Sequence, residues 1–272
     1  FARGDEMAHA ATQLFGGEMK LVNEKTFLPI ILFEKKRYVG KMYEEGRDGQ
    51  IRHTSVDAKG VQLVRRDVCP FVKNVYTDVM NALLHHMDVQ LAIERLGAWL
   101  DKLVRNEVDV AEFTLSKGLN KKYETDELPH VHVANKIRAR QPGSEPTMGD
   151  RVPFVYCELD RLGAKGFEKA EDPSYAVKMG LKVDRLHYLR RQLMNPISDL
   201  LKNFVPDGGA ALFASTIHAI ERQQERQHTV DYVQCDDGSP HKRARADMSA
   251  FLAPPRQRPT AKGRRRSTGK GY

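Results

Sequence analysis

The hydrophobic pattern of this chain changes near Pro70, and that change restricts the possible folds more than any other feature. Before Pro70, short apolar segments are separated by turn residues, a pattern typical of strands. The predicted strands are Met19–Val22, Phe27–Phe33, Arg37–Glu44 and His53–Asp57, with Gly46–Gly49 as a hairpin turn. The segment Asp5–Phe15 precedes them, and its i, i+3, i+4, i+7 apolar spacing predicts a helix packed on a sheet. The first part of the chain is therefore expected to be α+β.

After Pro70, apolar residues recur at helical spacing over long segments. The predicted helices are Pro70–Met87, Val89–Asn106, His130–Arg140, Asp184–Phe204 and Ala210–Gln227, with a short helix capped at Asp172-Pro173. Two extended segments are expected among them, Glu112–Ser116 and Arg151–Glu158. These patterns divide the chain into an α+β part (residues 1–69), a mainly helical part (residues 70–227) and a tail (residues 228–272).

The tail differs from the rest of the chain in charge. The 272 residues carry a formal net charge of +8, yet His241–Tyr272 alone contains ten Lys and Arg against one acid. The remainder is therefore close to neutral. From Ser239 onward the chain is rich in Arg, Lys, Pro, Gly and Ser, and it cannot bury enough apolar area to offset the entropy of ordering. We expect a disordered basic tail.

Composition excludes several classes of protein. No apolar run approaches the roughly 20 residues that a membrane-spanning helix requires. The N-terminal residues Phe1–Asp5 contain neither an initiator Met nor a secretory signal, and we interpret them as internal to a longer protein. Cys69, Cys157 and Cys235 lie far apart without C-x-x-C spacing, which argues against a disulfide framework or a zinc module. An intracellular protein that is neither secreted nor membrane-bound is expected.

Two basic clusters are the candidate binding residues. The first consists of Lys35, Lys36, Arg37 and Tyr38, between two predicted strands, and the second of Lys59, Gly60, Arg65 and Arg66. Lys and Arg neutralise phosphates, and a Tyr beside them can pack on a sugar while its hydroxyl bonds a phosphate oxygen. Asp67 is placed to hold one of the arginines by a salt bridge. Considered locally, each cluster is better explained as a solvated run of charges on the surface.

The order of these clusters resembles motifs of family B DNA polymerases, most closely the eukaryotic delta type and its relatives in large DNA viruses. Lys35–Tyr38 resembles the K-K-R-Y element of that family, and Lys59–Asp67 resembles its K-G-x-x-x-x-R-R-D element. Pro142–Ser144, Gly149–Pro153 and Glu171–Pro173 are similar to its P-G-S, G-D-R-V-P and E-D-P elements. The likeness extends over roughly the first three quarters of the chain.

The resemblance implies an α+β fold: an incomplete antiparallel-sheet palm, then a mainly α-helical thumb, then the disordered basic tail. It also implies that the first cluster grips primer–template DNA in its minor groove, while Lys59, Arg65 and Arg66 contact the backbone. Further contacts to the duplex are expected from the thumb residues Lys117, Lys121, Lys122, Arg138 and Arg140. For these thumb residues, a solvated helix face remains the alternative.

The family's chemistry depends on palm aspartates that hold two Mg²⁺ ions, one of them in a Y-G-D-T-D-S motif. Neither that motif nor the nucleotide-binding K-x-x-x-N-S-x-Y-G pattern occurs in this sequence, and in the family's order both precede Phe1. The intact protein is expected to be a DNA-directed DNA polymerase, a nucleotidyltransferase that uses Mg²⁺ and deoxynucleoside triphosphates. The segment by itself is expected to be inactive.

The region after residue 157 contains only Cys235, whereas cellular delta-type enzymes end in two cysteine clusters. We therefore expect no zinc or iron–sulfur cluster, which favours a viral-type enzyme. His85, His86, His130 and His132 are expected to be solvated or capping residues rather than metal ligands. Two basic runs, residues 241–245 and 262–266, are consistent with nuclear import, with a DNA tether, or simply with a solubilising tail.

The one apolar island in the polar tail resembles a sliding-clamp peptide, Q-x-x-M-x-x-F-F, through Met248, Phe251 and Leu252. Arg245 replaces the glutamine of that motif. The expected place of action is the nucleus or a viral replication site. The alternative function is a non-catalytic DNA-binding or sliding-clamp-associated module that consists only of palm and thumb.

Overall fold

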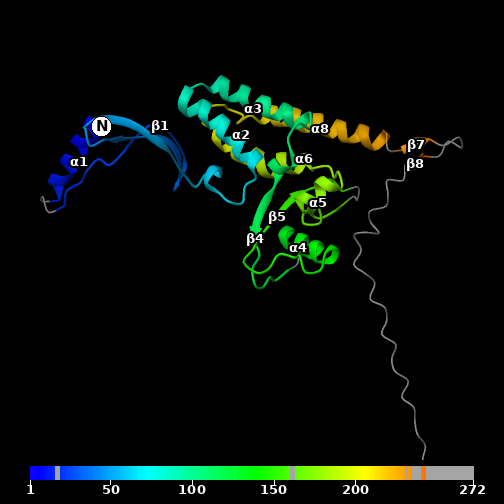
Figure 1. Cartoon of the computed structure of the whole chain (residues 1–272). Coiled ribbons are helices and arrows are strands. Elements are labelled where there is room, and N and C mark those ends of the chain that lie inside the picture. Colours follow the sequence, from blue (N-terminus) through cyan, green and yellow to red (C-terminus); the bar gives the residue numbers. More distant parts are fainter. Residues whose placement is uncertain (16–18, 126, 160–162, 231, 235–239, 243–272) are drawn as a thin grey trace, which may run out of the picture. The chain divides into compact units, whose positions relative to one another are not determined.

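The structure is a computed structural model, and it describes residues 1–15, 19–125, 127–159, 163–230, 232–234 and 240–242. The chain separates into two units, Phe1–Thr229 and Val230–Tyr272. The first unit combines helices with antiparallel sheets (Figure 1). The predicted α+β class is confirmed at this level. No helix within the described residues has the length and apolar content needed to cross a membrane.

The first sheet consists of three antiparallel strands in the order β1 (Thr26–Glu34), β2 (Arg37–Glu45) and β3 (Ile51–Lys59). The turn between β2 and β3 forms as predicted, since the amide of Gly46 donates to the Gln50 carbonyl and the amide of Gly49 to the Gly46 carbonyl. The strand predicted over Met19–Val22 does not form. Its apolar side chains are exposed, and no described strand lies beside it to supply backbone partners.

Helix α1 (Ala2–Leu14) is present, but the prediction that it packs on a sheet is wrong for this chain. None of its residues is buried, and Met7 and Leu14 are 72% and 86% exposed. The periodicity predicted the helix correctly. Periodicity does not show whether a partner for its apolar face is present.

The helical part begins where Pro70 occupies the first turn of α2 (Pro70–Asn81), a position in which its missing N–H leaves no bond unmade. A π-turn (Ala82–His86) continues α2 and ends at Met87, which has a left-handed φ of 52°. Helix α3 (Val89–Val104) starts at Asp88, whose carboxylate accepts a hydrogen bond from the amide of Leu91 at 3.0 Å. The two helices pack against each other through their apolar faces.

The segment predicted as extended over Glu112–Ser116 is instead a 3₁₀ turn (Val110–Phe113) followed by the short strand β4 (Leu115–Gly118). The turn places the Phe113 ring in the core, 5.1 Å from Phe71 and 4.7 Å from Tyr188. Burial of this ring therefore outweighs the local preference for a strand. Strand β4 pairs with β5 (Arg151–Tyr156), which pairs with β6 (Ala170–Glu171), all antiparallel.

Asp172 caps α5 (Pro173–Lys178) by accepting from the amide of Tyr175, as predicted. Helix α4 spans Pro129–Arg140. The helix predicted over Asp184–Phe204 is divided into α6 (Arg185–His187), a π-turn (Tyr188–Leu193) and α7 (Met194–Leu201). The wide turn precedes Pro196, which has no N–H to give to the carbonyl four residues before it. Helix α8 spans Ala210–Val230.

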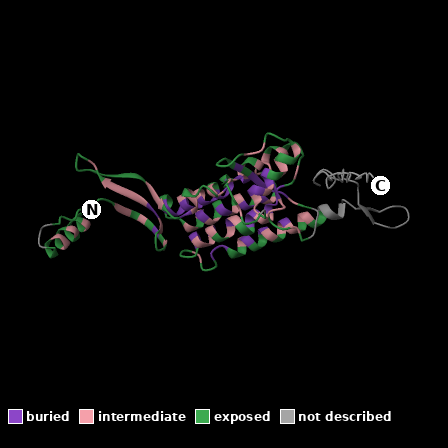
Figure 2. Cartoon of the chain, turned by 90° about the horizontal axis from the view of Figure 1, so that it is seen from below, coloured by how far each residue is buried: buried purple, intermediate pink, exposed green. Residues whose placement is uncertain are grey.

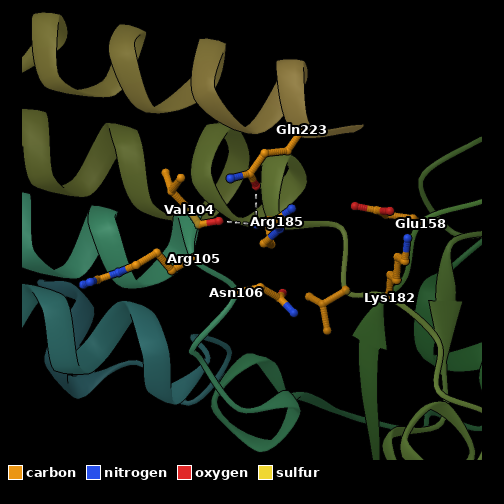
Figure 3. Close-up of a pocket in the computed structure, with 8 residues that line it drawn as sticks. Val104, Arg105, Asn106, Glu158, Lys182, Arg185 and Gln223 are labelled. Carbon is orange, nitrogen blue, oxygen red and sulfur yellow. Dashed lines mark hydrogen bonds between the residues drawn. The ribbon is translucent and has the colours of Figure 1, made fainter. Parts of the chain in front are cut away.

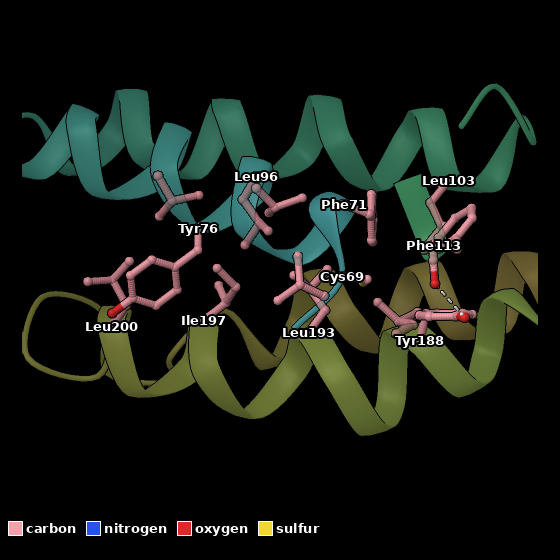
Figure 4. Close-up of a cluster of buried hydrophobic side chains, with 14 of the residues drawn as sticks. Cys69, Phe71, Tyr76, Leu96, Leu103, Phe113, Tyr188, Leu193, Ile197 and Leu200 are labelled. Carbon is pink, nitrogen blue, oxygen red and sulfur yellow. Dashed lines mark hydrogen bonds between the residues drawn. The ribbon is translucent and has the colours of Figure 1, made fainter. Parts of the chain in front are cut away.

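Buried residues gather in the helical part and become sparse along β1–β3 (Figure 2). The core contains Tyr76, Leu96, Leu193 and Ile197, which face one another between α2, α3 and α7 (Figure 4). At its centre the hydroxyl of Tyr188 donates to the Phe113 carbonyl at 2.7 Å and accepts from the amide of Tyr156 at 3.0 Å. The buried hydroxyl is thus satisfied as donor and acceptor, and it ties the π-turn to β5.

In the second unit, β7 (Tyr232–Gln234) pairs antiparallel with β8 (Pro240–Lys242). These two short strands lie within the tail that the sequence predicts to be disordered. Residues 243–272 lie outside the described residues, including the clamp-like Met248, Phe251 and Leu252 and most of the basic tail.

Candidate nucleic-acid interface

The two predicted basic clusters meet at one end of the first sheet. Lys35 and Lys36 form the turn between β1 and β2, and Tyr38 of β2 lies directly opposite Lys59, the last residue of β3. The ammonium group of Lys59 lies 5.7 Å from the centroid of the Tyr38 ring. We call the turn and strand-end residues Lys35, Lys36, Arg37, Tyr38, Lys59 and Gly60 the hairpin cluster.

Gly60 is what permits this close approach. Its φ is +65°, a conformation that disfavours any residue with a Cβ. A Cβ placed there would lie 2.8 Å from the carbonyl oxygen of Lys36 and 2.9 Å from Cγ of Arg37. The glycine of the second motif therefore packs against the backbone of the first motif. This contact brings the two motifs together in space.

Tyr38 is held in place by neighbours on the two strands that flank β2. Its hydroxyl donates to Oδ2 of Asp57 at 3.0 Å, and its ring makes an edge contact with Phe27 at 5.7 Å. Burial by itself would raise the pKa of Asp57, but hydrogen bonds from Tyr38 and Lys25 outweigh it and lower that pKa. The carboxylate stays ionised and orients the phenol. In this state the proton of the hydroxyl points to Asp57, so a phosphate oxygen would have to compete for it.

Arg37 joins the sheet to the helical part. Its Nη1 lies 3.5 Å from Glu34, and its Nη2 lies 3.3 Å from Oδ2 of Asp199 on α7. The guanidinium also lies over the Phe33 ring, 5.7 Å from its centroid. With two carboxylate partners, Arg37 is better suited to position the hairpin cluster than to grip a ligand.

Arg65 and Asp67 form the pair that the sequence predicted. Nε and Nη2 of Arg65 donate to the two carboxylate oxygens at 3.0 and 2.7 Å, and the hydrogen bonds from Arg65 lower the pKa of Asp67. The pair occupies one edge of the guanidinium and leaves the Nη1–Nη2 edge open. Arg66 is exposed, and its carbonyl accepts from Arg151, the arginine of the G-D-R-V-P element.

The predicted thumb residues separate into two groups. Lys117, Lys121 and Lys122 are exposed on β4 and the loop after it. Arg138 forms a salt bridge with Glu145 at 3.5 Å. Arg140 makes two hydrogen bonds to Glu171, at 2.8 and 2.9 Å, and its guanidinium carbon lies 3.5 Å from the centroid of the Tyr175 ring. Arg140 therefore contributes to packing, and its fork is already occupied.

Sequence reasoning missed the partners that hold these arginines. Glu171 is buried between Lys136 and Arg140, and hydrogen bonds from Arg140 together with the charge of Lys136 overcome desolvation and lower its pKa. The sequence signal for Glu171 was its place directly before the helix cap Asp172. Asp199, the partner of Arg37, lies 162 residues away along the chain, and no local pattern indicates that pair.

One hollow among the described residues is lined by an arginine that already bonds to the protein itself. It measures about 290 Å³ and is lined by Arg105, Asn106, Glu158, Lys182 and Arg185 (Figure 3). Nη1 of Arg185 donates to the carbonyls of Leu103 and Val104 at 3.1 and 2.8 Å and to Gln223 at 3.2 Å. Arg185 thereby caps the C-terminus of α3 and joins it to α8.

The described residues contain no cluster of three or more His, Cys, Asp or Glu able to hold a metal ion. The residues present thus do not fit the Mg²⁺ that the resemblance implies. His130 lies buried with its Nε2 3.0 Å from the hydroxyl of Tyr123, and His132 meets the edge of Phe167 at 5.3 Å. His85 lies 6.2 Å from His53, ring to ring.

Comparison with known proteins identifies the family. Residues 1–204 match the family model "DNA polymerase family B". The chain belongs to this family. A DNA polymerase delta catalytic subunit from Candida albicans is 34% identical over 203 residues, which cover 75% of this chain and 19% of that protein. A DNA polymerase from Paramecium bursaria Chlorella virus NY2A is 36% identical over 208 residues, covering 76% of this chain and 22% of that protein.

The chain thus spans about a fifth of the length of these curated relatives. Its fold is similar to that of the family B DNA polymerase from the hyperthermophilic archaeon Pyrobaculum calidifontis, with a TM-score of 0.50 and 24% identity. That similarity covers 73% of this chain and 24% of the archaeal chain. This family B chain therefore corresponds to one portion of a larger polymerase fold.

Proposed function

We propose that this family B chain is the part of a DNA-directed DNA polymerase that holds the primer–template duplex. The observation that carries the proposal is the contact of Gly60 with the backbone of Lys36, which joins the two basic motifs in one hairpin cluster. The ammonium group of Lys59 lies beside the ring of Tyr38, and Lys35 and Lys36 are exposed in the adjoining turn. Such contacts go to phosphates and to groove acceptors shared by all base pairs, so they hold DNA without regard to sequence.

In this proposal residues 1–69 are the end of a palm and residues 70–227 a thumb. Arg37 and its bridge to Asp199 hold the hairpin cluster against α7, while Arg65, Arg66, Lys117, Lys121 and Lys122 provide further contacts to the duplex. Gly60 contributes by its shape alone. Arg140 is left out, because Glu171 and the ring of Tyr175 already enclose its guanidinium, whereas Arg138 is exposed and remains a proposed contact.

The intact enzyme would join deoxynucleoside triphosphates to a primer end, with Mg²⁺ supplying the Lewis acid. The described residues offer no ligand set for that metal, so no chemical step is assigned to them, and the chain by itself is expected to be inactive. The place of action would be the nucleus or a viral replication site. A sliding clamp remains a further proposed partner, through Met248, Phe251 and Leu252 outside the described residues.

The proposal is tested by the affinity of the chain for a primer–template duplex, measured by fluorescence anisotropy at several salt concentrations. The double variant Lys36→Ala with Arg66→Ala is expected to lose about 1–3 kcal/mol of binding free energy and to show a shallower salt dependence. The control is Arg105→Ala with Lys178→Ala, which removes the same charge from exposed positions on α3 and α5. Equal losses in the two double variants would mean that the chain binds DNA only through its overall charge.

A further inference from the structure

A second hollow lies beside the Arg65–Asp67 pair. It measures about 270 Å³ and is open to solvent. Gln62, Arg65 and Asp67 line one side, and Arg191, Asn195 and Asp199 line the other. Segments more than 100 residues apart in the sequence thus converge on one open hollow of mixed charge.

Both carboxylates of this hollow already have cationic partners. Asp67 is paired bidentately with Arg65, which lowers its pKa. Asp199 is paired with Arg37 and with Lys202, each at 3.3 Å. Neither acid therefore needs the remaining cation of the hollow, and neither repels an incoming anion with an uncompensated charge.

Arg191 is that remaining cation. Its side chain is exposed, and within the described part of the chain it forms no salt bridge and no side-chain hydrogen bond. The adjacent Arg190, by contrast, is paired with Glu221 of α8. The two arginines are neighbours on one π-turn, and of the two only Arg190 forms a salt bridge among the described residues.

The donors around the hollow suit a tetrahedral oxyanion. Arg191 offers a planar set of N–H groups that matches two phosphate oxygens, and Arg65 keeps its Nη1–Nη2 edge open. The side-chain amides of Gln62 and Asn195 add uncharged donors on either side. The charges of the lining residues cancel, and Arg37 and Lys202, which pair with Asp199, add positive charge beside the hollow, so an anion fits better than a divalent cation.

We infer that this hollow binds one backbone phosphate of a nucleic-acid strand, with Arg191 and Arg65 as its two cationic contacts. The inference rests on the proposed duplex-holding function, because the hollow shares Arg65 with that surface and Arg66 is the next residue. It adds a contact from the π-turn before α7 that none of the basic motifs in the sequence includes.

The variant Arg191→Gln tests the inference, with Arg190→Gln as the matched control one residue away. Binding of a primer–template duplex by the 272-residue chain is measured by anisotropy over a range of salt. Arg191→Gln is expected to raise the Kd about three- to tenfold and to lower the slope of log K against log salt by about 1. Arg190→Gln is expected to leave that slope unchanged, and thermal unfolding verifies that both variants remain folded.

Neutral methylphosphonate linkages, placed one at a time along each strand, locate the phosphate. A methylphosphonate at one position is expected to weaken duplex binding by the unmodified chain and to leave duplex binding by Arg191→Gln unchanged. The inference is overturned if the loss of affinity caused by Arg191→Gln is the same with a methylphosphonate at any position. It is also overturned if Arg191→Gln causes no loss of affinity. The inference is likewise overturned if inorganic phosphate, at matched ionic strength, removes the difference in duplex affinity between the unmodified chain and Arg191→Gln. The hollow would then be a site for free anions.

The two hypotheses fail in different ways. If the Lys36→Ala, Arg66→Ala double variant loses affinity and Arg191→Gln does not, only the phosphate hollow is refuted. If neither the double variant nor Arg191→Gln changes affinity, the proposed duplex-holding function fails as well.

Discussion

Two arginine–carboxylate pairs in this chain have similar hydrogen-bond distances and opposite surroundings. Arg65–Asp67 and Arg140–Glu171 are both bidentate, with donor–acceptor distances between 2.7 and 3.0 Å. The side chains of the first pair are 52% and 43% exposed, whereas those of the second are 21% and 5% exposed. Lys136 and the ring of Tyr175 complete the enclosure of the second pair.

The two arginines both have a carboxylate partner, so their exposure to solvent is what distinguishes them. In the exposed pair, Asp67 orients Arg65 and leaves one guanidinium edge open to a ligand. In the buried pair, Glu171 balances two cations that would otherwise be desolvated without a counter-charge, so its contribution is to stability. Motif resemblance alone placed both arginines on a DNA surface, and only the buried environment separates Arg140 from it.

The largest expected effect comes from removing the acid of the buried pair. Glu171→Gln leaves Lys136 and Arg140 desolvated without a carboxylate and is expected to lower the free energy of unfolding by about 3 kcal/mol. Asp67→Asn, in the exposed pair, is expected to lower it by less than about 1 kcal/mol. Urea denaturation at neutral pH measures both. Equal losses would mean that burial does not distinguish the two pairs.

A smaller effect is expected at Gly60, which connects the hairpin cluster to the segment that carries Arg65. Gly60→Ala combines a left-handed φ with a close contact to Lys36 and is expected to reduce stability by about 2–3 kcal/mol. Gly180→Ala is the control, because its φ of +60° is similar and nothing lies within 4 Å of an added Cβ. It is expected to lose about 1 kcal/mol through backbone strain alone.

DNA affinity then separates the two glycine variants. Under conditions in which both proteins are folded, Gly60→Ala is expected to bind a primer–template duplex more weakly than Gly180→Ala. The reason is that the added Cβ displaces the backbone of Lys36 and Arg37. Indistinguishable affinities would show that the closeness of the two motifs is incidental to binding.

The smallest expected effect concerns acid stability of the helical part. His187 packs on Tyr156 with ring centroids 3.9 Å apart, its Nε2 has no hydrogen-bond partner among the described residues, and burial lowers its pKa to about 4. Asp184 opposes that shift, while Lys169 and Arg191 add to it. Between pH 6.5 and about 4 the unfolded chain therefore binds more protons at this residue, so its contribution to stability falls as the pH falls.

His187→Phe is expected to reduce the loss of unfolding free energy between pH 7 and pH 4.5 by about 1–2 kcal/mol. His218→Phe changes an exposed histidine on α8 and is the control, expected to leave that loss as it is. Urea denaturation at the two pH values measures both variants. A pH dependence in His187→Phe equal to that of the unchanged chain would assign the acid sensitivity to other groups.

Much of the local structure could be predicted because its signals lie within a few residues. Pro70, Asp172 and Asp184 each mark the start of a helix through backbone geometry or a side-chain cap that any sequence context would preserve. Prediction failed where the local structure depends on a contact with residues far away in the sequence. The Val110–Phe113 turn forms because Phe113 is buried between Phe71 and Tyr188, and Met19–Val22 is not a strand because no neighbouring strand pairs with it.

The sequence by itself determined most of the helices and strands, the order of the basic motifs and the resemblance to the polymerase family, which the comparisons then established. It also paired Arg65 with Asp67, since both lie within one short segment. Only the tertiary structure decided that Arg37 is held by Asp199, that Arg140 is enclosed by Glu171 and that Arg191 faces an open hollow. Charge pairing and desolvation depend on distances between residues far apart in the chain, and a local pattern of residue types contains no such distance.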